Sequence, residues 1–412
     1  MRALIVAMLL LGCSPVGPPV APYDAARDTP DDVRRDAPRD VPRDVPIETN
    51  PEWTVPPAVP ERCTVERASH PERLPALTWE ACGAGCTRSD LGTTWEAIDA
   101  WVVDGRTYFE LLSREFGRGD TDALAPAEGP VIDAWRYPIT GVAPACPMFW
   151  YEVAEARAAA FVVFLGDDDS RIIENQFWTF DLATGPSYGP ADITLEPPMV
   201  GNGRNTQEYV VSPVLEAFRI GYGSVVVSHG GTLQQIFPSN GFDLGLVGDH
   251  LTFLDAGDAH ALVQWTPERG LETLHDPADP LGYLRRDGTT LAWARLMDFV
   301  GSRATRAELW TADAVRDPAL FAPRLVNDRI EPDGVLGGGV YAWQVNSAVG
   351  TEAHLIDLDT GRHRVLPSPP GTWCDTLYVS REEVGLACGE PAGHRWIYQI
   401  EPDVQATDAP AP

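Results

Sequence analysis

The cysteines carry the most definite chemistry in this sequence, because a thiol can form a disulfide, bind a metal ion or carry a covalent group. Seven are present. Cys374 and Cys388 lie in two short apolar segments joined by the polar pair Arg381-Glu382. Folding these segments into a hairpin places the two cysteines opposite each other, as a cross-strand disulfide requires. We therefore predict a disulfide between Cys374 and Cys388.

Cys63, Cys82, Cys86 and Cys146 form a further even set, which indicates two more disulfides in an exported chain. Four cysteines allow three pairings, and the sequence does not choose among them. Metal binding by Cys82 and Cys86 is the alternative. No nearby histidine and no second closely spaced cysteine pair completes a ligand set. We expect no metal ion and no cofactor.

The seventh cysteine, Cys13, follows an apolar run, Ala3 to Leu11, that begins after Arg2. The run is shorter than the roughly 20 residues that a membrane-spanning helix needs, so we interpret it as a secretory signal. Its end, Leu10-Leu11-Gly12-Cys13, resembles the lipobox of bacterial lipoproteins. The resemblance implies that residues 1–12 are removed and that a lipid on Cys13 holds the protein in the cell envelope, at the outer membrane. The alternative is an ordinary cleaved signal with an incidental cysteine.

Residues 13–60 have the composition of a tether. Within them, residues 35–46 read Arg-Asp-Ala-Pro, Arg-Asp-Val-Pro, Arg-Asp-Val-Pro. A proline at every fourth position fixes φ, removes hydrogen-bond donors and disfavours helix in the preceding residue. We therefore expect a disordered, extended spacer between the lipid and the folded part of the chain.

Composition limits the partners. The chain has 60 acidic residues against 31 basic ones, for a formal net charge of -29, and contains no lysine. A surface with this charge repels the phosphates of nucleic acids. We expect a membrane contact through the lipid and a protein partner, but no nucleic acid.

Catalytic signatures are scarce. The sequence contains no Gly-x-Ser-x-Gly, His-Glu-x-x-His or Gly-x-x-x-x-Gly-Lys motif. The acidic clusters Asp167 to Asp169 and Asp255 to Asp258 lie between apolar segments, so we interpret them as solvated hairpin turns and not as cation sites. His250 and His260 can face each other across a turn, but single strand histidines are more often structural than ligands. We predict no catalytic residue.

The elements that position these residues are strands. Runs such as 160–165, 224–228 and 339–343 are short, rich in β-branched or aromatic residues, and bounded by Gly, Asp or Asn. An apolar strand that ends in a polar turn recurs about every 44 residues, with one blurred unit near residues 221–228. Its markers are Tyr137, Asp181, Thr266, Asp313, Asp357 and Gln399.

This period is typical of propeller blades and predicts an all-β chain with a seven-bladed β-propeller. The turn Asp-x-x-Thr-Gly at Asp181 to Gly185 and Asp357 to Gly361 resembles the WD40-like and TolB-like propeller families. We place the propeller at residues 95–403, a cysteine-containing segment that packs on it at 61–94, and a disordered tail at 404–412. Two tandem β-sandwich domains are the alternative fold.

The favoured function is a membrane-anchored, extracytoplasmic protein-binding or scaffolding module, because a propeller offers a broad surface and no catalytic motif is visible. The alternative is a propeller enzyme or a carbohydrate-binding protein with its site in the central funnel. Residues from different blades converge there and leave no linear motif. A cluster of charged side chains in the funnel would favour a ligand-binding site.

Replacing Cys13 tests the anchor. The Cys13→Ala variant has no thiol for lipidation, so we expect it in the soluble fraction of the expressing bacterium, whereas the unchanged protein sediments with membranes. Retention of the variant in the membrane fraction would contradict the lipoprotein assignment.

Overall fold

The computed structural model describes residues 53–54, 66–68, 70–115, 119–137, 148–154, 156–165, 172–185, 208–212, 214–220, 224–229, 232–237, 241–255, 261–300, 303–315, 317–347 and 350–408. Several residues singled out above lie outside these ranges: Cys13, Cys63, Cys146, Asp167 to Asp169, Asp258 and His260.

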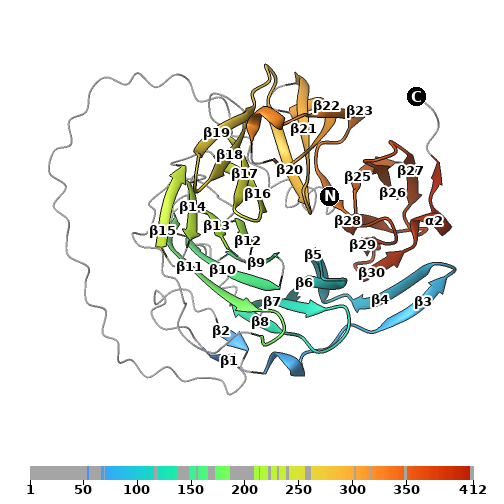
Figure 1. Ribbon diagram of the computed structural model, residues 1–412. Coiled ribbons are helices and arrows are strands. Elements are labelled where there is room, and N and C mark those ends of the chain that lie inside the picture. Colours follow the sequence, from blue (N-terminus) through green and yellow to red (C-terminus); the bar gives the residue numbers. More distant parts are fainter. Residues whose placement is uncertain are drawn as a thin grey trace, which may run out of the picture.

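The described strands form seven sheets arranged around one centre, and each sheet is a blade (Figure 1). Blade 1 consists of β5 (Trp95–Val103), β6 (Arg106–Glu115), β7 (Gly119–Pro126) and β8 (Asp133–Tyr137), extended outward by β2 (Glu66–Ala68) and β1 (Trp53–Thr54). Blade 2 consists of β9 (Met148–Ala154), β10 (Arg157–Leu165) and β11 (Ile172–Asp181). Blade 3 consists of β12 (Glu208–Val211), β13 (Glu216–Ile220), β14 (Ser224–His229) and β15 (Thr232–Phe237).

The next two blades repeat this pattern. Blade 4 consists of β16 (Gly241–Val247), β17 (His250–Asp255), β18 (Ala261–Thr266) and β19 (Gly270–His275). Blade 5 consists of β20 (Leu281–Asp287), β21 (Thr290–Val300), β22 (Arg303–Asp313) and β23 (Arg324–Ile330).

The last two blades also contain strands from elsewhere in the chain. Blade 6 consists of β24 (Gly334–Gly337), β25 (Val340–Ser347), β26 (Gly350–Asp357), β27 (His363–Pro367) and β31 (Thr407–Asp408). Blade 7 consists of β28 (Trp373–Val379), β29 (Val384–Gly389), β30 (Arg395–Ile400), β4 (Cys86–Gly92) and β3 (Trp79–Gly83). The described helices are single turns: η2 (Pro71–Arg73), η3 (Pro318–Leu320) and α2 (Pro402–Gln405).

The predicted fold class is confirmed: the chain is an all-β propeller with seven blades. Most repeat markers fall on the third strand of a blade, and the blurred unit corresponds to β14. Tyr137 is the exception, because it ends the fourth strand of blade 1. The predicted number of blades is therefore confirmed, although the marker in blade 1 lies on the fourth strand and not on the third.

The recurring Asp-x-x-Thr-Gly sequence is a turn with a clear physical basis. Asp357 Oδ1 accepts hydrogen bonds from the backbone N–H groups of Asp359 (3.1 Å) and Thr360 (2.8 Å). Gly361 then adopts a φ of 71°, which glycine tolerates better than other residues. Asp181 and Gly185 repeat the arrangement, with a φ of 69° at the glycine. Both turns lead out of the third strand of a blade.

Strands from opposite ends of the described chain close the ring. β4 pairs antiparallel with β30, so residues that were expected to pack on the propeller instead supply two strands of blade 7. β31 likewise joins blade 6 within the segment expected to be a disordered tail. The sequence of β4, Cys-Thr-Arg-Ser-Asp-Leu-Gly, is too polar to be recognised as a blade strand.

The hydrophobic core lies between successive blades. Phe253, Trp293 and Trp343 lie in the second strands of blades 4, 5 and 6, and none is more than 3% exposed. Trp293 packs with Leu254 and Leu262 of the preceding blade. Full burial of one such side chain contributes about 1.5–3 kcal/mol, so each blade is stabilised chiefly by its neighbours.

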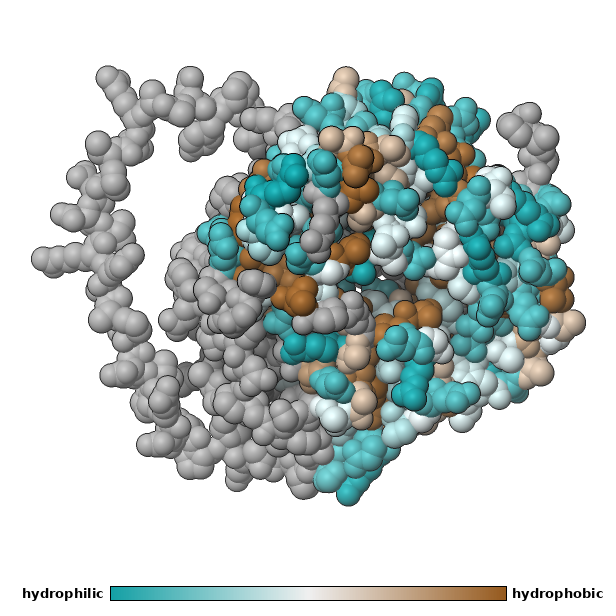
Figure 2. Space-filling model, viewed as in Figure 1, coloured by the Kyte–Doolittle hydropathy of each residue, from teal (hydrophilic) through white to brown (hydrophobic). Residues whose placement is uncertain are grey.

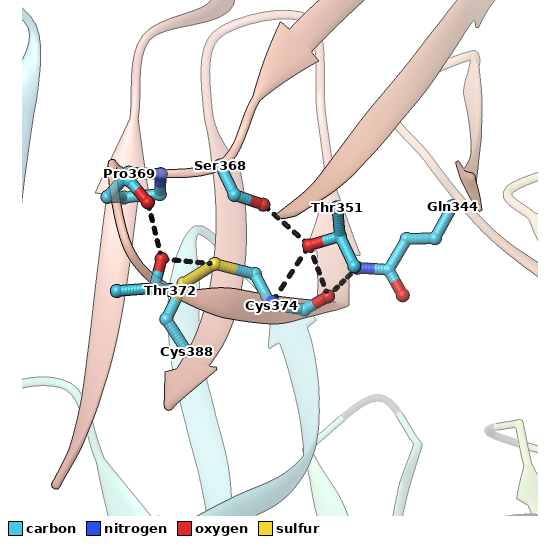
Figure 3. Close-up of a disulfide and its surroundings, with 7 residues drawn as sticks. All are labelled: Gln344, Thr351, Ser368, Pro369, Thr372, Cys374 and Cys388. Carbon is cyan, nitrogen blue, oxygen red and sulfur yellow. Dashed lines mark hydrogen bonds between the residues drawn. A yellow bond between two sulfur atoms is a disulfide. The ribbon is translucent and has the colours of Figure 1, made fainter. Parts of the chain in front are cut away.

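The structure joins Cys374 to Cys388, the pair that the sequence predicts, and joins Cys82 to Cys86 across the β3–β4 turn. Cys374 and Cys388 are direct cross-strand partners in β28 and β29, and both are buried. Blade 6 holds the backbone of Cys374 as well: its N–H donates to Thr351 Oγ1 (2.8 Å), and Gln344 Nε2 donates to its carbonyl oxygen (Figure 3). The disulfide therefore fixes the inner strand of the closing blade.

Removing this disulfide tests its contribution. The double variant Cys374→Ala/Cys388→Ala should lose about 2–4 kcal/mol in the free energy of unfolding, because the unfolded chain gains the freedom of the opened loop. Urea unfolding measures the loss. The control Cys82→Ala/Cys86→Ala opens a much shorter loop and should lose less. Labelling of Cys374 and Cys388 by a thiol reagent in the native, non-reduced protein would show that the bond is absent.

Candidate functional site

The inner strands of the blades surround the centre of the ring. Each contacts the inner strand of the next blade, and β28 contacts β5, so the circle is complete (Figure 1). In every blade the chain passes from the inner strand to the next strand outward, although β1 to β4 join the outer edges of blades 1 and 7 from earlier in the chain. The space-filling view shows the surface hollowed at the centre of the ring (Figure 2). We call the part of this space that the inner strands surround from their first residues to their midpoints the funnel mouth.

Four aspartates lie at the same distance along the chain from the first hairpin of their blade: three are within inner strands, and Asp333 immediately precedes β24. Each lies four residues before the residue at which the inner strand turns into the second strand. The aspartates are Asp99, Asp243, Asp333 and Asp375, and the corresponding turn residues are Val103, Val247, Gly337 and Val379. We call them the mouth aspartates. Tyr283 has the same position in blade 5.

Solvent reaches the mouth aspartates. Asp99 and Asp375 are exposed, and the side chain of Asp333 is 75% exposed. Trp373, two residues before Asp375 on β28, leaves 49% of its surface exposed although it is a large aromatic residue. The mouth thus offers accessible carboxylates beside an accessible aromatic ring.

The backbone is distorted where these side chains lie. The pairing of the inner strand with the second strand shifts by a bulge in blades 1, 4, 5 and 7. At two of the bulges, Asp243 and Tyr283 have φ values of 52° and 56°. A positive φ costs a residue with a side chain about 1–3 kcal/mol, and bulges commonly redirect side chains near functional sites.

Arg285 is the central cation of the mouth. Its Nε donates a hydrogen bond to the carbonyl oxygen of Gly334 (2.9 Å), and its Nη2 donates to Asp333 Oδ1 (3.4 Å). Its Nη1 lies 3.8 Å from Asp243 Oδ1. One guanidinium on β20 thereby links blades 4, 5 and 6.

Some carboxylates near the funnel have a structural task. In three places the carboxylate of one blade accepts a hydrogen bond from a backbone N–H on the inner strand of the next blade. These contacts join Glu110 to Tyr151 N (3.2 Å), Glu208 to Leu244 N (2.8 Å) and Asp243 to Leu284 N (2.9 Å). These hydrogen bonds connect neighbouring blades. Asp243 forms one of them, whereas Asp99, Asp333 and Asp375 do not take part in these three contacts.

The funnel walls make ionisation of these acids more costly than at an open surface. Asp99 faces the solvent inside the funnel, but the surrounding blades keep bulk water away. This desolvation raises the pKa of Asp99 to about 6, although the positive charge of Arg285 acts to lower it. Desolvation raises the pKa of Asp243 to about 6 as well. The pKa of Glu152 is raised well above its usual value by burial and by the charges of Asp99 and Glu208. These acids therefore take up a proton more readily than acids at an open surface, while Arg285 and Arg219 partly offset the effect at Asp243 and Glu152.

The other residues considered in the sequence do not meet at this place. His250 is buried, and its Nε2 lies 3.5 Å from Oδ1 of Asp249. The histidine expected to face it, His260, is outside the described residues. Among the described residues, no three His, Cys, Asp or Glu side chains are grouped as a metal site. Within the same ranges, no helix has the length and apolar character needed to cross a membrane.

Sequence reasoning missed the mouth aspartates, although a signal for them exists. Each is the first residue of a five-residue segment whose last residue leads into the first hairpin turn of the blade. Examples are Asp243-Leu-Gly-Leu-Val and Asp333-Gly-Val-Leu-Gly. Aligning the blades on their third strands hides this regularity, because the bulges change the spacing within the inner strands. Aligning them on the first hairpin of each blade reveals it.

Comparison with known proteins gives a likeness of fold. No protein-family model and no curated protein sequence matches the chain. Among solved structures, it is similar to the β-propeller domain of the Trilobed protease from Pyrococcus furiosus, with 9% identity over 77% of this chain and 96% of that chain and a TM-score of 0.47. It is also similar to oligogalacturonate lyase from Vibrio parahaemolyticus, with 11% identity over 79% of this chain and 97% of that chain and a TM-score of 0.48.

The raised pKa of Asp99 predicts a pH-dependent cost in stability. An acid whose pKa is higher in the folded than in the unfolded protein favours folding when protonated, so the cost is present above about pH 6 and vanishes below the ordinary value of 3.8. The Asp99→Asn variant should therefore unfold at a higher temperature than the unchanged protein at pH 7.5 and at the same temperature near pH 3.5. The rim variant Asp313→Asn is the control and should show no such difference. A lower unfolding temperature for Asp99→Asn at pH 7.5 would contradict the prediction.

Proposed function

We propose that this protein is a binding module whose funnel mouth takes a positively charged segment of a partner protein. The observation that carries the proposal is the placement of Asp99, Asp243, Asp333 and Asp375 at one position relative to the first hairpin of four blades. Repetition of one residue type at one position surrounds a common point with carboxylates. Arginine and lysine side chains are the protein groups that complement such a point.

Charge supports this choice of partner. Arg285 is engaged by Gly334 and Asp333, so carboxylate charge at the mouth remains in excess. Confined solvent makes the attraction between opposite charges stronger than at an open surface. The net charge of -29 also attracts a basic partner from a distance and speeds its association.

The anchor belongs to the same proposal. Lipidation of Cys13 and the spacer at residues 13–60 would hold the propeller in the bacterial envelope while allowing the funnel mouth to reach a partner. A spacer of this kind in polyproline-like conformation extends by about 3.1 Å per residue. The proposed role is that of a tethered receptor for a basic segment.

A carbohydrate ligand is a second candidate, and Trp373 is the observation that favours it. An exposed aromatic ring can stack on the apolar face of a sugar, and Asp375 nearby can accept hydrogen bonds from hydroxyl groups. In this case binding would depend on Trp373 more than on the net charge of the mouth.

Binding of a synthetic tetra-arginine peptide, measured by isothermal titration calorimetry, tests the first candidate. The triple variant Asp99→Asn/Asp333→Asn/Asp375→Asn should bind at least tenfold more weakly, because each lost ion pair is worth about 0.5–1 kcal/mol. The control Glu268→Gln/Asp313→Asn/Asp328→Asn removes the same charge from exposed positions away from the mouth and should change the affinity less than twofold.

Two outcomes would overturn the proposal of a basic partner. Equal weakening in both triple variants would mean that the peptide responds to net charge alone. Absence of peptide binding, together with binding of a neutral oligosaccharide that Trp373→Ala abolishes, would replace it with the carbohydrate candidate.

A further inference from the structure

Two histidines meet on blade 6, outside the funnel. His354 lies on the third strand, β26, and His363 on the fourth strand, β27, whereas the funnel is lined by the first strand, β24. Nδ1 of His354 and Nε2 of His363 are 3.0 Å apart. Neither residue has a part in the funnel mouth.

Trp343 positions both imidazole rings. It is the direct cross-strand partner of His354, and it is only 3% exposed because it packs in the interface between blades 5 and 6. Its ring centre lies 5.3 Å from that of His354 and 5.1 Å from that of His363. A rigid aromatic surface thus holds the two rings toward each other before any ligand binds.

The spacing of the rings suits a shared metal ion. Their centres are 5.1 Å apart. Two imidazoles that bind one ion at about 2.0–2.1 Å, with a tetrahedral angle between them, have ring centres about 5 Å apart. Only small rotations of the rings would turn the facing nitrogens from each other toward a common ion.

The protonation states also suit metal binding. A hydrogen bond between two ring nitrogens requires one of them to be an unprotonated acceptor. Burial lowers the pKa of both His354 and His363, so the neutral form that binds metal ions is favoured. Glu352 Oε2 lies 3.9 Å from Nε2 of His354, on the far side of the ring. A carboxylate there favours a proton on Nε2 and leaves Nδ1 to face His363.

We propose that His354 and His363 form a two-histidine site for a divalent transition metal ion. The side chain of His354 is 20% exposed, so an ion can enter from solvent. No third protein ligand is grouped with them among the residues that the structure describes, and water completes the coordination. Imidazole ligands select copper, nickel and zinc over calcium or magnesium, and the expected order of affinity places Cu²⁺ above Zn²⁺.

Calorimetric titration of the full chain with Zn²⁺ tests the site, using protein purified without a histidine tag. The unchanged protein should bind one ion in a saturable manner, and Ca²⁺ should give no heat of binding. Replacing one ligand, His363→Gln, should weaken Zn²⁺ binding at least tenfold. The control His275→Gln should change it less than twofold, because His275 also contacts two tryptophans, Trp293 and Trp310, but has no histidine partner in the described structure.

A second variant and a second measurement distinguish the loss of a metal ligand from a loss of folding. His354→Gln should weaken Zn²⁺ binding in the same way as His363→Gln, with circular dichroism spectra unchanged in both. Cu²⁺ bound beside Trp343 should quench tryptophan fluorescence in the unchanged protein and not in either variant. Absence of saturable Zn²⁺ binding, or equal affinity in the unchanged protein and both variants, would overturn the proposal. Neither result bears on the funnel mouth, because the two sites share no residue.

Discussion

The pairing of β4 with β30 is the interaction on which the rest of the structure depends. A ring of blades has no central core of its own, and each blade is stable because its neighbours cover both faces. An open ring would leave the faces of two blades in water. Closing the ring joins residues such as Thr87 and Gln399, which are 312 positions apart and form a hydrogen bond. The entropy of closing so long a loop costs on the order of 5 kcal/mol, which the strand pairing and the burial of Leu91 and Ile397 must offset.

Ring closure also explains why charge can be concentrated at the centre. The inner strands are edge strands, with backbone groups that face the funnel and are free of a further strand on that side. Bulges, positive φ values and carboxylates at this edge prevent another strand from pairing there. The same features place Asp99, Asp333 and Asp375 in a confined space. A feature that protects the edge thus also gathers carboxylates in one place, and the raised pKa of Asp99 reflects the desolvation of a carboxyl group in that confined space.

The sequence predicts the blades better than it predicts the funnel. The third strands could be found because Asp181 and Asp357 cap turns by local hydrogen bonds, and a local contact leaves a local motif. The closing strand was missed because β4 is recognised only by its partner β30, which lies at the other end of the chain. The mouth aspartates were not predicted for a related reason: they lie near one another in the folded protein but far apart in the sequence. The Cys374–Cys388 disulfide was predictable because a short hairpin brings its ends together.

The order in which the N-terminal strands join the ring has a mechanical consequence. A pull from the N-terminal side of the chain reaches β1 and β2 first, at the outer edge of blade 1, where each strand is only two or three residues long. These strands can peel away without opening the ring. β4 lies farther along the chain, held between β3 and β30, and the Cys82–Cys86 bond stiffens the turn that leads into it. Tension on the N-terminal side of the propeller is therefore met first by short outer strands, while the funnel keeps its shape.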